Sequence, residues 1–398
     1  MTREIERLRA VLRRLETRPF PDPSIPRPPT PAPTWAGEIV ETAEGSCLFV
    51  RRRFPLTHRQ GRVALHLAAS ASPLSLGAGG GVAPGEALYL DTETTGLAGG
   101  TGTYPFLIGV GRFTADAFEI EQVFMRDFHE EPVLLELLAR RLPEASGLVT
   151  YNGRGFDLPL LETRYLLARR PWPGQSLPHL DLLPLARRVW RGLVGDFRLG
   201  SLEAVLLGHE RDGDVPGAMI PQLYFRYLRE RDLSALENVF EHNTQDLLTL
   251  AVLTGRLATL IHQGEVEHPE EWVGLGRFWE GRDWDRSVAC YRQALTTALP
   301  PDQVVEVRQR LGRVLRRLGR WEEAKEVWAA WAAEERVGLE PLEELAKYLE
   351  HRVRDLQAAR QIVVRALILA ESEENSLLPA LRHRLHRLEC RLAGRRWY

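Results

Sequence analysis

The sequence predicts an α/β domain, with a mixed sheet flanked by helices, followed by an all-α domain of helical repeats. Three observations predict this order. Apolar runs typical of strands crowd residues 86–151. Strand and helix patterns then alternate to about residue 262. After about residue 268, helical spacing continues without further strand patterns. A chain of 398 residues is long enough for two such domains and an appendage.

The N-terminal part predicts an appendage over residues 1–36. Residues 1–17 have the spacing of a short helix, and residues 18–34 contain eight prolines, which predict an extended linker. Residues 37–67 alternate apolar and polar side chains, which indicates a few strands, and residues 70–85 form a loop rich in Gly, Ala and Ser. We expect residues 37–85 to form a small strand-containing region.

The middle of the chain predicts the central sheet of an α/β domain over residues 86–265. Its first strand ends in the run ALYLD at 87–91, and 105–113 and 117–125 predict two antiparallel neighbours. Residues 147–151 predict a further strand. Helical spacing is found at 131–142, 156–168, 181–191, 200–207 and 232–262.

Residues 266–398 predict repeats of paired helices. Trp272, Leu275, Gly276 and Trp279 fit the W-x2-L-G-x2-aromatic opening of a tetratricopeptide repeat. A pattern of large and small residues then recurs at spacings of 37 and 35 residues. Its members are Trp284, Ser287, Tyr291 and Ala294, then Trp321, Ala324, Trp328 and Trp331, then Leu356, Ala359, Val363 and Ala366. An unrelated helical bundle is the alternative.

Composition excludes membrane-spanning classes and favours a reducing compartment. No apolar run approaches the roughly 20 residues that a bilayer requires, and the N-terminus lacks the apolar core of a signal peptide. Three cysteines far apart give no zinc motif. We therefore expect a cytoplasmic protein without a membrane partner. The formal net charge is −2, but it is +5 over residues 1–80, −7 over 85–262 and 0 over 263–398. An acidic middle beside a basic flank suits a nuclease, although chance surface charge explains it equally well.

The first chemical motif is Asp91-Thr92-Glu93, followed by Thr94, at the end of a predicted strand. Residues i and i+2 of a strand share a face, so Asp91 and Glu93 direct two carboxylates at one point. Two such carboxylates repel each other unless a cation lies between them, and hard oxygen ligands suit Mg²⁺ or Mn²⁺. Strand ends often carry acids, so this motif alone is weak.

Two further motifs place acids beside the first. Residues 151–157 (YNGRGFD) join a strand to a helix and place Asp157 near the N-terminus of that helix, where an N-cap is the alternative role. In the predicted helix 232–262, His242 and Asp246 share one face because they are four residues apart. A surface pair on an amphipathic helix is the alternative there.

Together the three motifs resemble the DEDD (DnaQ-like) exonuclease superfamily of the ribonuclease H-like fold, over about residues 86–262. The last motif has the spacing of the tyrosine class but carries a histidine. Asp181-Leu-Leu-Pro-Leu-Ala-Arg-Arg, Arg198-Leu-Gly-Ser-Leu-Glu203, Asp214-Val-Pro-Gly217 and Leu223-Tyr-Phe225 resemble the YprB-like bacterial family, of the mitomycin repair factor B type. Those proteins join a ribonuclease H-like exonuclease domain to C-terminal tetratricopeptide-like repeats.

The resemblance implies a 3′–5′ exonuclease that hydrolyses DNA with two divalent ions, Mg²⁺ or Mn²⁺, in DNA repair. The metal ligands it implies are Asp91, Glu93, Asp157 and Asp246, and His242 becomes the general base. Substrate-binding candidates are Thr94, Asn152, Phe156, Arg187 and Arg188. Solvated helix faces explain the two arginines equally well, and packing explains Phe156. The role of Asp181 is more often helix capping than catalysis.

Partners and alternatives follow from the same resemblance. Nucleic acid is the expected partner, with DNA favoured over RNA, and a helicase is a plausible partner of the repeats. One alternative is an exonuclease that acts on RNA, because no motif identifies a reader of the 2′-hydroxyl. The other is a non-catalytic binding module, which an intact set of four acids disfavours because unpaired buried charges cost stability.

Overall fold

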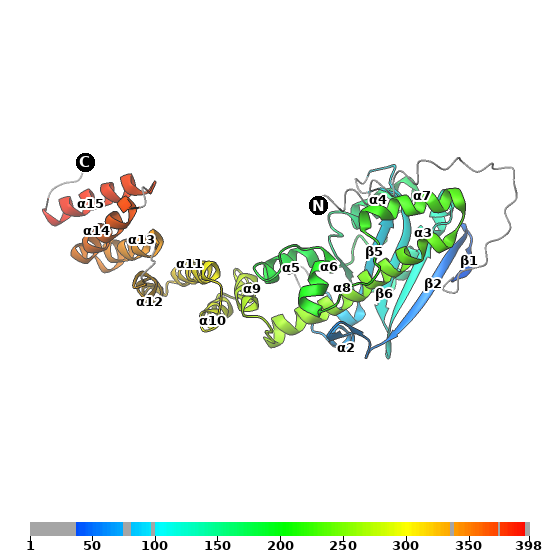
Figure 1. Ribbon diagram of the computed structural model, residues 1–398, viewed down its shortest axis with the longest axis horizontal. Helices are drawn as coiled ribbons and strands as arrows, with labels where there is room; N and C mark the ends of the chain where they lie inside the picture. The colour runs from blue at the N-terminus through cyan, green and yellow to red at the C-terminus, as the bar shows by residue number, and fades with distance from the viewer. Residues whose placement is uncertain (1–36, 75–80, 97–99, 335–337, 373–374, 395–398) are drawn as a thin grey trace. The chain divides into compact units, whose positions relative to one another are not determined.

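The structure, a computed structural model, describes residues 37–74, 81–96, 100–334, 338–372 and 375–394 (Figure 1). The predicted N-terminal helix and the proline-rich linker lie outside these residues. The described chain forms two compact units. Unit 1 runs to Leu185 and resumes over Asp196–Glu265, and unit 2 consists of Ala186–Gly195 and the chain from Val266 onward.

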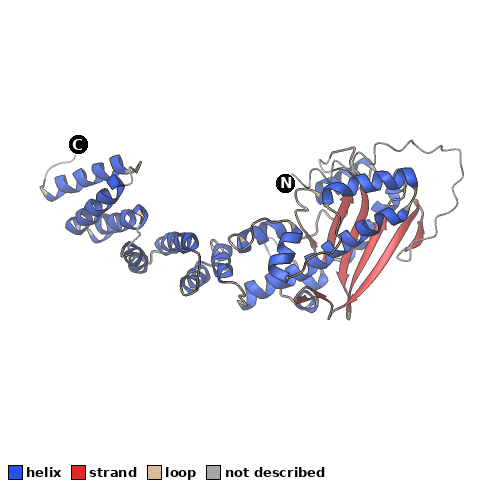
Figure 2. Cartoon of the chain, viewed as in Figure 1, coloured by secondary structure: helices blue, strands red, loops and turns tan. Residues whose placement is uncertain are grey.

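Unit 1 is built on a seven-stranded mixed sheet with the order β1-β2-β7-β6-β5-β8-β9 (Figures 1 and 2). Its strands are β1 (Glu38–Thr42), β2 (Gly45–Pro55), β5 (Leu88–Thr94), β6 (Pro105–Phe113), β7 (Ala117–Phe124), β8 (Leu148–Thr150) and β9 (His179–Asp181). β5, β8 and β9 pair in parallel and the other pairs are antiparallel. A separate two-stranded sheet pairs β3 (Arg59–Gln60) with β4 (Val63–Ala64).

The predicted mixed sheet with flanking helices is confirmed, and β6 has the bounds that the sequence indicates. Two features go beyond the prediction. β1 and β2, expected in a separate region over 37–85, extend the main sheet because β2 pairs with β7 along eight residues. The strand β9 and the helix α7 (Ile220–Glu230) were not expected. Pro221 lies in the first turn of α7. A helix tolerates proline there because the N–H groups of the first turn have no backbone acceptor within the helix.

Helices α3 (Glu131–Arg141), α7 (Ile220–Glu230) and α8 (Glu237–Gln263) contact the sheet. The other helices before residue 265 are α2 (His66–Ala69), α4 (Asp157–Leu167), α5 (Leu182–Trp190) and α6 (Leu199–Leu202), and the second half of α5 belongs to unit 2. α8 is the longest of all these helices and most of its residues are buried, so it is a central element of unit 1 and not a surface helix. Among the described residues, no helix is both long and apolar enough to cross a membrane.

Unit 2 is helical, as the sequence predicts. After residue 266 its helices are α9 (Pro269–Trp279), α10 (Trp284–Leu295), α11 (Pro301–Arg317), α12 (Trp321–Ala332), α13 (Leu339–Tyr348), α14 (Leu356–Ser372) and α15 (Leu378–Leu392). Consecutive helices contact each other in pairs. A Cβ on Gly276 would lie 2.2 Å from the ring of Tyr291, and a Cβ on Gly312 would lie 2.4 Å from that of Trp328. Both pairs therefore need glycine on one helix beneath an aromatic ring on the next.

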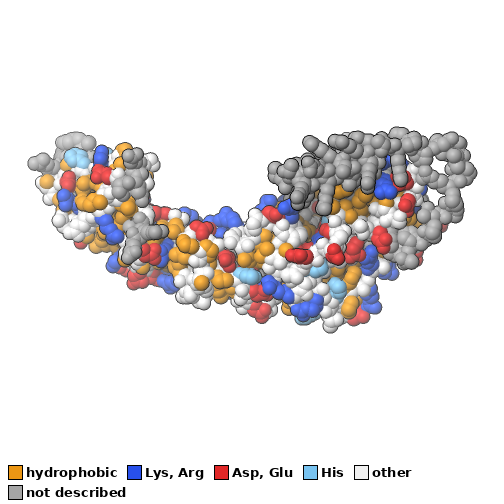
Figure 3. Space-filling view, in the orientation of Figure 1, with side chains coloured by type: hydrophobic (Ala, Val, Ile, Leu, Met, Phe, Trp, Pro, Cys, Tyr) orange, Lys and Arg blue, Asp and Glu red, His pale blue; other side chains and the backbone are white. Residues whose placement is uncertain are grey.

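The surface of unit 2 carries charges of both signs. On the face shown in Figure 3, acidic and basic side chains are interspersed over its helices. Many arginines form ion pairs, such as Arg316 with Glu344 and Arg310 with both Glu280 and Glu306. Acidic and basic side chains of unit 2 thus pair within and between its described helices.

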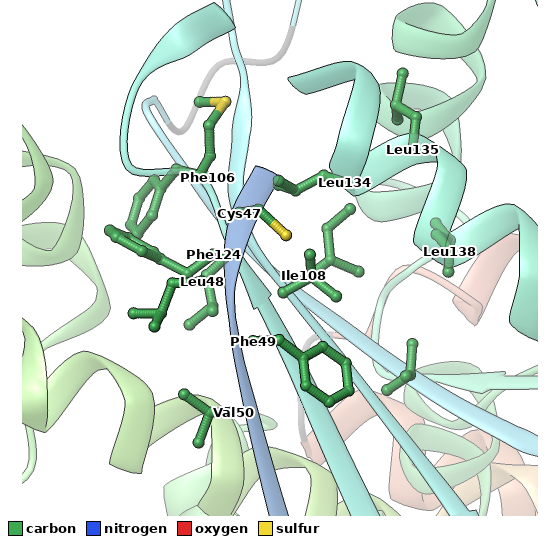
Figure 4. Close-up of a cluster of buried hydrophobic side chains, with 14 of the residues drawn as sticks. Cys47, Leu48, Phe49, Val50, Phe106, Ile108, Phe124, Leu134, Leu135 and Leu138 are labelled. Carbon is green, nitrogen blue, oxygen red and sulfur yellow. The ribbon is translucent and has the colours of Figure 1, made fainter. Parts of the chain in front are cut away.

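The core of unit 1 lies on both faces of the sheet (Figure 4). Leu48 and Phe124 lie on the side of α7 and α8, where Phe124 contacts Phe240 of α8 with ring centroids 5.3 Å apart. Leu134 and Leu138 of α3 cover the opposite face. Because side chains alternate along a strand, every second residue of β5, β6 and β7 is directed at α8. This alternation determines which polar residues of β5 face that helix.

Candidate active site

The end of β5 places two carboxylates on the face covered by α8. Asp91 and Glu93 are partly exposed, whereas Thr92 and Thr94 are buried. Asp91 lies opposite Gly109 of β6, and a Cβ on Gly109 would lie only 2.1 Å from Oδ1 of Asn243 in α8. The glycine therefore lets α8 approach the sheet beside Asp91.

One turn of α8 brings three polar side chains to this point. Nε2 of His242 lies 3.5 Å from Oδ2 of Asp246 and 4.0 Å from Oε1 of Glu93. Asn243 Nδ2 donates a hydrogen bond of 2.7 Å to Asp91 Oδ2. The i, i+4 spacing of a helix puts His242 and Asp246 on one face of α8. Both side chains therefore reach Glu93 at the end of β5.

Asp157 joins the cluster from the first turn of α4. Its Oδ1 accepts a hydrogen bond of 2.6 Å from the hydroxyl of Thr92, the residue between the two acids of β5. The preceding turn needs Gly153, because a Cβ there would lie 2.3 Å from Oγ1 of Thr150. Asn152 has φ of 62°, a left-handed conformation that asparagine tolerates better than most residues.

The carboxylate of Asp181 accepts hydrogen bonds both from this turn and from the first turn of α5. Its Oδ1 accepts hydrogen bonds from the backbone N–H groups of Asn152 (2.8 Å) and Leu183 (3.1 Å), and its Oδ2 accepts one from the N–H of Arg154 (3.1 Å). The contact with Leu183 caps the first turn of α5, the role that the sequence favours. Asp181 thus supports the turn that leads to Asp157.

Burial raises the pKa values of all four carboxyl groups, and repulsion from the other acids adds to this at Asp91 and Glu93. Burial is the largest cause at Asp91, followed by the charges of Asp246 and Asp157, and its pKa is well above the ordinary value. Burial also raises the pKa of Glu93 well above its usual range, and the neighbouring acids add to this. Burial raises the pKa of Asp157 to about 6, although the hydrogen bond from Thr92 opposes the shift. The pKa of Asp246 is raised by burial and lowered in part by Arg211.

His242 and Asp214 form a pair beside these acids. Nδ1 of His242 lies 2.7 Å from Oδ1 of Asp214. Burial alone would lower the pKa of His242, but the hydrogen bond to Asp214 and the charge of Asp246 outweigh it and raise the pKa. At Asp214, burial raises the pKa of the carboxyl group. The hydrogen bond with His242 and the charges of His242 and Arg211 outweigh burial and bring this pKa below its usual value.

The residues present fit a divalent cation. Ligand atoms of Glu93, His242 and Asp246 all lie within 4.8 Å of one another. Carboxylate oxygens are the ligands that Mg²⁺ and Mn²⁺ prefer. A cation among the carboxylates would offset the repulsion that adds to burial in raising the pKa values of Asp91 and Glu93.

The candidate substrate-binding residues are placed less uniformly. Thr94 is adjacent to Glu93 but donates its hydroxyl to the carbonyl of Gly96 (2.8 Å). Asn152 is exposed and Phe156 half-buried in the turn before Asp157. Arg187 is exposed, and the side chain of Arg188 donates to the carbonyl of Arg277 (2.7 Å), so its contacts lie within unit 2.

Sequence reasoning gave no role to five residues that support the acids and His242: Thr92, Asn243, Arg211, Asp214 and Glu203. Arg211 donates to Asp246 Oδ1 at 2.5 Å and also pairs with Glu203, whose side chain is 0% exposed. Gly109 in the middle of a strand was a usable signal, because glycine there often marks a close approach of another element. Nothing comparable in the sequence marks Arg211.

Three comparisons with known proteins show what the chain is similar to. Residues 88–258, which include all four acids and His242, match the ribonuclease H superfamily. The protein YprB of Bacillus subtilis (strain 168) is 29% identical over 350 residues, covering 83% of this chain and 84% of that protein. A family B DNA polymerase of the archaeon Pyrobaculum calidifontis has a TM-score of 0.36 and 15% identity, covering 52% of this chain and 29% of the polymerase. Residues 88–258 thus match the ribonuclease H superfamily and are nuclease-like, and the chain is similar to YprB over most of its length.

Proposed function

We propose that the protein is a DEDD-type 3′–5′ exonuclease that hydrolyses phosphodiester bonds of DNA with two divalent ions, Mg²⁺ or Mn²⁺. The observation that carries the proposal is the cluster of Glu93, His242 and Asp246 from β5 and α8. The charges of Asp91, from β5, and Asp157, from α4, act on the carboxyl group of Glu93. Four acids with raised pKa values in one cluster, two of them buried and two partly exposed, destabilise a protein unless they serve a ligand.

In the reaction, the four acids hold the ions and His242 handles the proton. When bound, the ions would stabilise the charge on the attacking and leaving oxygens of an in-line displacement. His242 accepts a proton from the attacking water at Nε2, the ring nitrogen that faces Glu93 and Asp246. The broken bond is the terminal phosphodiester, and the product is a 5′-nucleoside monophosphate.

Alanine at each acid tests this proposal. We expect Asp91→Ala, Glu93→Ala, Asp157→Ala and Asp246→Ala each to abolish cleavage of a labelled oligonucleotide in the presence of Mg²⁺ or Mn²⁺. Glu162→Ala is the matched control, because Glu162 is an exposed acid on the same helix as Asp157. Near-normal turnover by any two of the four variants would contradict the assignment, provided that circular dichroism shows them folded.

The substrate class and the setting need a separate experiment. Digestion of matched DNA and RNA oligonucleotides, each single- and double-stranded and labelled at either end, decides between DNA and RNA and gives the polarity. We propose DNA repair as the setting and a helicase as a partner of unit 2 on the likeness to the YprB-like family alone. If no substrate is cleaved but oligonucleotides are bound, a binding module replaces the exonuclease.

A further inference from the structure

The loop between η4 (Glu203–Leu207) and η5 (Gly217–Met219) lies against the catalytic face of α8. Two of its residues, Arg211 and Asp214, contact the two functional side chains of that helix. Gly208 and Gly213 have φ values of 61° and 70°, which let the loop turn back on itself. The loop therefore has the shape to bring both side chains to α8.

The contact between Asp214 and His242 selects which ring nitrogen carries hydrogen. An ionised carboxylate only accepts hydrogen bonds, so Nδ1 of His242 must donate to Asp214 Oδ1 across their 2.7 Å. In the neutral ring, Nε2 is then free of hydrogen. This nitrogen faces Asp246 Oδ2 at 3.5 Å and Glu93 Oε1 at 4.0 Å, so its lone pair is directed toward the acids.

Arg211 contacts both acids that lie next to His242, namely Asp214 and Asp246. Its side chain is only 8% exposed and donates to Glu203 Oε2 at 2.7 Å, which fixes the guanidinium within unit 1. It also donates to Asp246 Oδ1 at 2.5 Å and to Asp214 Oδ2 at 3.3 Å. In both acids the arginine takes one oxygen. The other oxygen of Asp214 is left for His242, and that of Asp246 lies toward His242.

We propose that Asp214, fixed by Arg211, is a positioning residue that holds His242 in the Nδ1–H tautomer, with Nε2 available to accept the proton of the attacking water. This inference deepens the proposed function and rests on it for its catalytic consequence. Partners of a catalytic histidine that fix its tautomer and orientation are worth large factors in rate. A pair of fully solvated side chains would have no such effect. Here the side chains of Arg211, His242 and Asp214 are 8%, 16% and 28% exposed.

The first test reads the tautomer in the full-length, metal-free protein, without reference to activity. Ring ¹⁵N shifts of labelled histidine, recorded where the rings are neutral, should show the Nδ1–H form at His242, with His242→Gln used to assign the signal. Asp214→Ala should shift His242 toward the Nε2–H form. Asp212→Ala is the matched control, since Asp212 is an exposed acid of the same loop, and it should leave the tautomer unchanged. Asp214→Glu should restore part of the wild-type signal.

The second test reads turnover. Asp214→Ala should lower kcat by roughly 10–100-fold, the usual effect of removing a partner that orients an active-site histidine, with KM for a short oligonucleotide unchanged. In a His242→Ala background, Asp214→Ala should cause no further loss, because the aspartate acts through the histidine. Additive losses in the double variant would overturn the proposal.

The outcomes separate this proposal from the exonuclease assignment. If Asp214→Ala keeps the wild-type tautomer, the positioning role is wrong, whatever the activity. If the tautomer changes but an active enzyme keeps its kcat, the catalytic role of the positioning is wrong. If the tautomer changes and the wild type cleaves no nucleic acid, the positioning of His242 is supported and the exonuclease function fails.

Discussion

His242 is the residue whose role most needs separating from that of its neighbours. Its Nε2 lies close enough to Glu93 and Asp246 to serve either as a base or as a metal ligand. These two roles predict different effects of removing the ring. A base is needed for turnover but not for binding the ions, whereas a ligand is needed for both.

We expect His242→Ala to lower turnover by roughly 10²–10⁴-fold, the usual range for loss of a general base. Affinity for Mn²⁺ should change little, because the four carboxylates remain. Steady-state kinetics and a calorimetric Mn²⁺ titration of the same preparations measure the two effects. An equal loss of metal affinity would identify His242 as a ligand.

The same variant should change the pH dependence of the rate. Wild-type activity should fall on the acid side, since a protonated imidazole accepts no further proton, and His242→Ala should flatten that limb. Acid limbs that match in the two proteins, with similar turnover, would leave the histidine without a catalytic role.

Glu93 gives a prediction for the metal-free protein. Burial and the neighbouring acids raise its pKa, so between its unfolded and folded pKa values the native state binds more protons than the unfolded state. Stability then falls as pH rises through that window. Glu93→Gln should therefore melt at a higher temperature than wild type at neutral pH without metal. The difference should vanish below about pH 4, where Glu is protonated in both states.

Thermal melts at several pH values, with and without Mg²⁺, check this expectation. Glu162→Gln, at an exposed position of α4, should behave as wild type. Added Mg²⁺ should raise the melting temperature of wild type more than that of Glu93→Gln. If the variant is less stable than wild type at neutral pH, the acids do not repel one another as described.

At the scale of elements, the loop that carries Arg211 supports the next prediction. Arg211→Met leaves Glu203, which is 0% exposed, without its cation. Breaking a buried pair from one side usually costs about 3–5 kcal/mol. Urea unfolding of the full-length protein measures the loss of stability. The double variant Arg211→Met/Glu203→Leu should recover part of it. Arg198→Met, which removes an exposed pair with Asp196, should change little. A loss no larger than that of Arg198→Met would contradict the structural role of Arg211.

Elements with a local signature were predictable from the sequence. The apolar run of β6 and the periodicity of α8 indicate these elements without knowledge of their neighbours. The buried residues Ile220, Tyr224 and Tyr227 give α7 a helical period that is visible in the sequence. Pro221 argued against a helix there, because proline is disfavoured inside helices. That β1 and β2 join the main sheet depends on pairing with β7, about 70 residues away along the chain.

The candidate site divides in the same way. Its acids lie in short motifs whose spacing follows strand and helix geometry, so Asp91 with Glu93 and His242 with Asp246 could be paired in advance. Their partners could not, because Asn243 meets Asp91 across 152 positions of sequence and Asp214 meets His242 across 28. No local pattern records such contacts.

At the scale of the whole molecule, the two units are not consecutive in sequence. Residues 186–195 lie within the sequence of unit 1 but belong to unit 2. Trp190 is fully buried, and its indole N–H donates to Glu271 at 2.9 Å. A Cβ on Gly274 would lie 1.8 Å from the carbonyl oxygen of Val189, so α9 packs directly on this segment. A cut at residue 265 would therefore expose the end of α5.

A truncation series tests the separation of the units. A fragment ending at 298, which keeps α9 and α10, should retain cleavage of short oligonucleotides. A fragment ending at 265 should be less soluble and less stable, because Trp190 loses its cover. Matched purification, melting and activity measurements compare them. Equal behaviour of the two fragments would show that residues 186–195 need no partner, and inactivity of a folded 298 fragment would contradict two separable functions.

The position of residues 186–195 also has a consequence for synthesis on the ribosome. Trp190 leaves the exit tunnel 81 residues before Glu271, and Gly192 leaves it 111 residues before Gln303, its partner in α11. At about 5–20 residues per second, roughly 4–16 s pass between the emergence of Trp190 and that of Glu271 in α9, against which Trp190 packs. During that interval the nascent chain presents an unburied tryptophan and the apolar side of α5. Slow translation through α9 would lengthen this exposure, so the yield of folded protein should depend on the elongation rate over residues 266–303 more than on the rate over α14 and α15.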